Sequence, residues 1–213
     1  MKKITLMILS TAATFCGSTP IFGQAYFIYQ NSSTSDVLLF NYDTATSTKM
    51  FGSAGTFDFG LYMGSAGSTS LSQMQLVDLA MSPNAAASTS FDAGLFNGGT
   101  VYSPGNVPNT INFQGGTQYA FLVAGWSASA GSTYNQALAV SGDPGVFLGI
   151  SDLGFITPAI VPSPAPNLFG TSAGQLLGFT LYGTPEPATI ALGGLGAAAL
   201  LLFRRGKSLK IRM

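Results

Sequence analysis

The chain has 213 residues, of which 46% are apolar and 12% aromatic, which is enough to bury the core of one domain. Only 8% of the residues are charged, against about 25% in an ordinary soluble domain. Between Tyr26 and Gly183 the single cation Lys49 stands against seven Asp residues. We therefore expect no nucleic-acid partner, because contacts to phosphates need clustered Lys and Arg.

The first 25 residues have the pattern of a secretory signal peptide. Lys2 and Lys3 form a charged start, Ile4–Phe15 forms a short apolar stretch, and small residues follow. Cleavage after Gly23 or Ala25 fits this pattern. The pattern predicts export through the secretion translocon, and it leaves a mature domain without Cys, His or Arg.

Residues 26–183 predict an all-β domain, an antiparallel β-sandwich of jelly-roll-like or Ig-like type. Short stretches rich in aromatic and β-branched residues alternate with clusters of Gly, Ser, Asn, Asp and Pro. The expected strands are Tyr26–Gln30, Val37–Tyr42, Phe57–Met63, Met74–Ala80, Thr110–Phe113, Thr117–Trp126, Val146–Ile150 and Gln175–Tyr182.

Two of these segments carry further information. Thr117–Trp126 is apolar at both odd and even positions, which is typical of a central strand covered on both sides. Ser132–Val140 is the one segment of the domain that favours a helix, of at most two turns, with Ser132 or Thr133 as its cap.

The domain offers little catalytic chemistry. Without His and Cys, neither a serine triad nor a zinc site can form, and the Asp residues lie mostly in sequences typical of turns. A carboxylate pair or a calcium site remains as an alternative, although no calcium-binding repeat is present. Trp126 and Tyr134 are the candidate sugar contacts, with packing in the core as the other interpretation of Trp126. We expect no cofactor and no metal.

The C-terminal 30 residues, 184–213, predict a membrane segment. Ala188–Phe203 is free of charge and would extend about 24 Å as a helix, slightly less than a hydrocarbon core of about 30 Å. Pro185 and Pro187 precede this run, and a basic cluster beginning at Arg204 follows it. By the positive-inside rule this cluster stays in the cytoplasm, so the domain faces away from it.

This tail resembles the PEP-CTERM sorting signal of Gram-negative bacteria. The resemblance is carried by the motif Pro185, Glu186, Pro187, by the apolar run, and by Arg204 and Arg205 after it. It implies that an exosortase, a membrane processing enzyme, recognises the tail and removes it near the Pro-Glu-Pro motif. Family members occur in bacteria that also make exopolysaccharide.

In this interpretation Arg204, Arg205 and Lys207 stop and orient the membrane segment. The tail extends past the arginines by GKSLKIRM, which departs from the many signals that end almost at once. The alternative is an ordinary, permanent C-terminal anchor.

A second resemblance covers the domain. The stretches GLFNGGTVY and AGWSASAGSTYNQAL are similar to those of uncharacterised PEP-CTERM proteins of Verrucomicrobia-type bacteria, to which no activity is attached.

Together these patterns predict a non-catalytic secreted protein, not an enzyme. We expect it to be held transiently at the inner membrane and then delivered to the cell surface or extracellular polysaccharide matrix, with exopolysaccharide as a candidate partner. Two alternatives remain: a carbohydrate-binding module or weak carboxylate-dependent glycosidase, and a permanently membrane-anchored surface domain.

Overall fold

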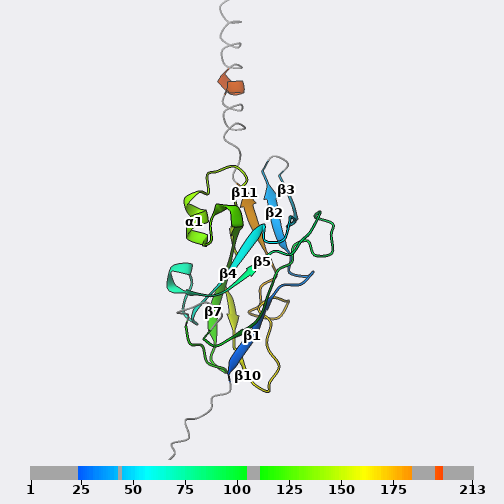
Figure 1. Cartoon of the computed structure of the whole chain (residues 1–213). Helices are drawn as coiled ribbons and strands as arrows, with labels where there is room; N and C mark the ends of the chain where they lie inside the picture. The colour runs from blue at the N-terminus through cyan, green and yellow to red at the C-terminus, as the bar shows by residue number, and fades with distance from the viewer. Residues whose placement is uncertain (1–23, 43–44, 105–110, 184–194, 199–213) are drawn as a thin grey trace, which may run out of the picture.

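The computed structural model describes residues 24–42, 45–104, 111–183 and 195–198. In these residues strands dominate and helices are few and short, so the predicted all-β class is confirmed (Figure 1). The strands are β1 (Ala25–Gln30), β2 (Val37–Asn41), β3 (Thr46–Lys49), β4 (Phe57–Ser65), β5 (Gln75–Met81), β6 (Asn97–Tyr102), β7 (Tyr119–Ser127), β8 (Phe147–Ile150), β9 (Gly154–Ile156), β10 (Ala159–Ile160) and β11 (Phe179–Gly183). Within residues 24–183 the helices are α1 (Tyr134–Ala139) and the 3-10 turns η1 (Leu71–Gln73) and η2 (Ala128–Ala130).

The strands form two sheets. The small sheet has the order β10-β1-β6, and the eight-stranded sheet has the order β3-β2-β11-β8-β7-β4-β5, with β9 also paired to β7. One hydrophobic cluster joins their inner faces, where Phe27 and Tyr29 of β1 meet residues such as Phe59 of β4 and Phe121 of β7. Phe96, just before β6, stacks on Phe59 with ring centroids 4.5 Å apart. Aromatic rings therefore fill a large part of the core between the sheets, together with aliphatic side chains and Met.

Strand β7 is the central strand of the large sheet, as its sequence predicted. Phe121 and Val123 face the core between the sheets, whereas Leu122 and Trp126 face outward. The outward residues are also buried, because α1, η1 and the neighbouring loops cover that face. Helix α1 begins where expected: the Thr133 side chain accepts a hydrogen bond from the backbone N–H of Gln136 and caps the helix.

Strand β11, the last in the sequence, lies inside the large sheet and not at its edge. It pairs with β2 on one side, in parallel, and with β8 on the other, antiparallel. The expectation of a purely antiparallel sandwich is therefore wrong at this pair. The two strands can run in parallel because they are far apart in the chain, so no tight hairpin joins them.

The predicted strand Thr110–Phe113 does not form in its described part. Residues 111–113 have no strand partner, although Phe113 is buried against the ring of Phe27 at 5.2 Å. The apolar residues in this segment therefore indicate burial in the core, but the segment forms no hydrogen-bonded ladder with another strand. The predicted strand Gln175–Tyr182 begins later, at Phe179, because residues 172–178 form a turn and an isolated bridge.

Strands β3, β6, β9 and β10 were not expected. The two glycines of β6 hide its strand character: Gly98 is required by packing, whereas Gly99 has a φ of 75°, a backbone conformation that favours glycine. A Cβ on Gly98 would lie 2.3 Å from the ring of Tyr29, so a larger residue cannot fit there.

The buried side-chain amide of Asn31 connects the end of β1 to the segment that precedes β6. The side chain of Asn31 donates hydrogen bonds to the carbonyls of Ser35 and Gly94, and it accepts one from the N–H of Phe96. These bonds satisfy backbone groups that are shielded from water, which holds the segment before β6 against the end of β1.

The expected apolar helix Ala188–Phe203 lies almost entirely outside the described residues. Its described part, residues 195–198, is helical. Where the chain is described, no helix has both the length and the apolar character needed to cross a membrane. The expected signal peptide, residues 1–25, lies outside the described residues apart from its last two.

Candidate functional site

The sorting motif follows the folded domain directly. Strand β11 ends at Gly183, and the residues predicted to carry the signal begin at the next position. Pro185, Glu186 and Pro187, together with Arg204, Arg205 and Lys207, lie outside the described residues. Figure 1 shows that β11 and β2 end at the same end of the domain, whereas β10 lies at the opposite end.

The two candidate sugar contacts lie together, but inside the protein. Trp126 is fully buried, and Tyr134 of α1 packs against it with ring centroids 6.2 Å apart. The indole N–H donates a 2.8 Å hydrogen bond to the carbonyl of Gly131. Neither ring offers an open face on which a sugar could stack, so the pair is a packing element between β7 and α1.

The acidic residues are spread over the domain. Asp36, just before β2, forms an ion pair with Lys49 of β3, with Nζ 2.6 Å from Oδ2. Asp92, Asp143 and Asp152 are exposed in loops, in agreement with their turn-like sequences. Asp58 and Asp78, in contrast, lie on strands β4 and β5, where the turn interpretation is wrong.

Asp58 and Asp78 point to opposite faces of the large sheet. Asp58 is opposite Trp126 in the β4–β7 register and therefore faces outward, whereas Asp78 is opposite the core residue Leu61. A carboxylate pair for glycoside hydrolysis needs both groups on one substrate, about 5–10 Å apart, which this arrangement does not provide. Within the described ranges, no group of three or more acidic, Cys or His side chains could hold a metal ion.

Burial changes the acidity of two groups near these strands. It raises the pKa of the Asp58 carboxyl above its usual value. It also raises the pKa of the buried Tyr29 hydroxyl, and the nearby charge of Asp78 adds to that increase. Both shifts disfavour the charged form, which is the effect of a low-dielectric surrounding.

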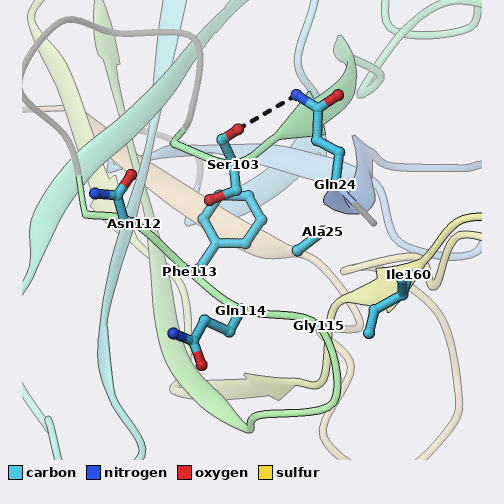
Figure 2. Close-up of a pocket in the computed structure, with 8 residues that line it drawn as sticks. All are labelled: Gln24, Ala25, Ser103, Asn112, Phe113, Gln114, Gly115 and Ile160. Carbon is cyan, nitrogen blue, oxygen red and sulfur yellow. Dashed lines mark hydrogen bonds between the residues drawn. The ribbon is translucent and has the colours of Figure 1, made fainter. Parts of the chain in front are cut away.

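A cavity lies beside the start of β1 and β10 (Figure 2). Figure 1 places β10 at the end of the domain opposite the end of β11. The volume of the cavity is about 630 Å³. Figure 2 shows its lining residues: Gln24, Ala25, Ser103, Asn112, Phe113, Gln114, Gly115 and Ile160. None of them is charged, and three carry side-chain amides, so the cavity combines neutral hydrogen-bonding groups with apolar surface.

The segment that forms one wall of this cavity is held by hydrogen bonds that its backbone N–H groups donate. The N–H of Gly116 donates to the carbonyl of Pro158, and the N–H of Gln114 donates to the hydroxyl of Tyr119. A Cβ on Gly115 would lie 2.0 Å from Ile160, so only glycine allows the segment to approach β10 this closely. Sequence patterns did not indicate this cavity, because its residues come from four separate segments and share no motif.

Comparison with known proteins locates one family match in the chain. The family model of the PEP-CTERM protein-sorting motif matches residues 184–205. The chain therefore carries this sorting motif, as its sequence predicted, and the motif implies export and processing by exosortase, a membrane enzyme. No curated protein matches the chain. No solved structure matches it either.

The raised pKa of Asp58 leads to a prediction about stability. The folded state holds the Asp58 proton more tightly than the unfolded state, so the contribution of this carboxyl to stability falls as the pH rises through its raised pKa. Replacing it by a neutral amide, Asp58→Asn, should stabilise the protein at pH 7 by less than about 1 kcal/mol, because Asp58 is partly exposed to solvent.

At about pH 3, below the usual pKa of Asp, the two proteins should be equally stable, because the carboxyl is protonated in both states. Urea unfolding at the two pH values measures the difference. Asp152→Asn, at an exposed loop position, is the matched control and should change little at either pH. A stabilisation by Asp58→Asn that is the same at pH 3 and pH 7 would contradict the assignment.

Proposed function

We propose that the protein is a non-catalytic exported domain that an exosortase releases from its tail and delivers to the cell surface or the extracellular polysaccharide matrix. In this proposal the N-terminal 25 residues direct the chain to the translocon. Residues 188–203 then hold it transiently in the inner membrane, oriented by Arg204, Arg205 and Lys207. The mature protein ends near the motif Pro185-Glu186-Pro187.

The observation that carries this proposal is the position of the sorting motif relative to the fold. The motif match begins at residue 184, immediately after the last residue of β11. Removing the tail there leaves every strand of the described residues 24–183 in place, so the released domain keeps both of its sheets.

The distribution of functional groups supports a role without catalysis. The domain has no His, and its two strand-borne carboxylates, Asp58 and Asp78, lie on opposite faces of the large sheet. Acid–base catalysis needs groups positioned around one substrate, and these are separated by the sheet itself.

Processing can be tested by the mass of the mature protein. We expect the chain to lose its tail near residues 185–188 in a host with the matching exosortase, and to keep it in a host without one. Changing Pro185, Glu186 and Pro187 to alanine should leave the full-length chain in the inner membrane, since these residues lie outside the apolar run. Intact mass spectrometry of membrane and secreted fractions measures both results.

A matched control changes three residues of a second proline-containing segment, Thr157, Pro158 and Pro162, to alanine. The intact mass of this variant should show that its tail is still removed at the same place. Identical C-termini in the two hosts would contradict processing by exosortase. That outcome would favour a permanently anchored surface domain.

The uncharged cavity favours a second candidate function, binding of a neutral carbohydrate. The amides of Gln24, Asn112 and Gln114 can donate to and accept from hydroxyl groups, while Ala25 and Ile160 provide apolar contact. Among the described residues none that lines the cavity is charged, which disfavours an acidic or basic ligand. Exopolysaccharide made of neutral sugars fits this chemistry.

Affinity electrophoresis tests this candidate. A panel of neutral polysaccharides, including dextran, should contain at least one that retards the protein, whereas the acidic polymers alginate and heparin should not. The double change Asn112→Ala and Gln114→Ala should abolish the retardation, and Gln75→Ala, at an exposed position of β5, should leave it unchanged. Carbohydrate binding would be contradicted if no neutral polymer retarded the protein, or if Gln75→Ala lost the retardation as completely as the double variant.

A further inference from the structure

Three aromatic side chains form a cluster on the outer face of the large sheet, beside the end of β11. The ring of Phe40 lies 4.9 Å from that of Tyr42 and 5.6 Å from that of Tyr182. The parallel register aligns Tyr182 of β11 directly with Phe40 of β2, so the two share one face. Tyr42 and Tyr182 each pack against Phe40, yet they remain 48% and 52% exposed to solvent.

This cluster lies at the point where the folded domain meets its membrane-directed tail. Tyr182 is six residues before Ala188, the first residue of the apolar run. Six residues extend at most about 20 Å. When the apolar run is in the membrane, the cluster is therefore within about 20 Å of the bilayer, whether or not the processing enzyme is bound.

The chemistry of the cluster suits the headgroup layer of a membrane. Tyr side chains combine an apolar ring with a hydroxyl group, and they are enriched where hydrocarbon meets water. Among the residues of β2, β3 and β11, the one charged side chain is Lys49, which pairs with Asp36. The three strands themselves would thus lose little charge hydration if this surface approached the lipid; Asp43, the residue after Tyr42 in the sequence, lies outside the described residues.

We propose that Phe40, Tyr42 and Tyr182 form a membrane-interface contact that seats the domain on the lipid headgroups while its tail is in the bilayer. The contact holds the end of β11, and with it the start of the sorting motif, at the membrane surface where processing takes place. Lipid is the occupant because the short connection places the bilayer within reach in every molecule. This inference rests on the membrane stage of the proposed function.

Tryptophan reporters in the full-length chain test the contact. Tyr42→Trp and Tyr182→Trp exchange one aromatic ring for another, and the chain is reconstituted in phosphatidylethanolamine–phosphatidylglycerol vesicles. Lipids brominated near the headgroup should quench the emission of both reporters and shift it to the blue. The buried Trp126 of the unchanged chain gives the background to subtract.

The matched control is Phe91→Trp, a more exposed aromatic position, at 90%. Phe91 lies near Gly94, whose carbonyl accepts from the N–H of Val37 at the start of β2, away from the end that carries Tyr42. Its reporter should show no quenching by the same lipids.

Absence of quenching at Tyr42 and Tyr182, or equal quenching at Phe91, would overturn the proposal. Quenching that requires co-reconstituted exosortase would also overturn it, in favour of a protein contact. The vesicles contain no enzyme in the main experiment, so a failure of processing and a failure of the lipid contact can be told apart.

Discussion

Strand β11 is the element on which the large sheet depends. In the order β3-β2-β11-β8-β7-β4-β5 it is the connection between the β2–β3 pair and the rest of the sheet. Its inner residues Phe179 and Leu181 are buried in the shared core, where the ring of Phe179 lies 6.2 Å from that of Phe59. The domain therefore becomes complete only when its last five residues are in place.

The position of β11 inside the large sheet is consistent with a sorting motif that begins only after this strand has ended. The sorting motif begins at the residue after β11, so recognition and removal of the tail need not disturb a strand that is paired on both sides. The same arrangement brings the aromatic cluster of Phe40, Tyr42 and Tyr182 next to the tail. Strand β11 thus completes the large sheet and also leads directly into the sorting motif.

Sequence patterns predicted the parts of the fold that depend on local chemistry. The apolar positions on both sides of β7 indicated a central strand, and Ser132 or Thr133 was the expected start of α1, which the structure places at Thr133. The parallel pairing of β2 with β11 could not be predicted, because it depends on contacts between residues far apart in the chain. β6 was hidden for a similar reason: Gly98 weakens the strand pattern, yet it is required by the ring of Tyr29, a distant residue.

The candidate sites also differ in how far they could be predicted from the sequence. The sorting motif is a linear signal, so it could be named from the sequence, and the family match confirms the motif over residues 184–205. The cavity near Phe113 and the outward position of Asp58 depend on the register of the strands, which no short pattern contains. The burial of Trp126 depends on α1, whose Tyr134 and Ala137 cover it, and no pattern within β7 contains that contact.

The most direct test of this account is the unfolding of two chains that differ only in β11. A chain of residues 24–183 should unfold in one cooperative thermal transition with a β-type circular dichroism spectrum. A chain of residues 24–178, which lacks β11, should show no cooperative transition, because β2 and β3 lose their link to the sheet and Phe179 and Leu181 leave a gap in the core. Equal melting temperatures for the two chains would contradict the claim that β11 closes the domain.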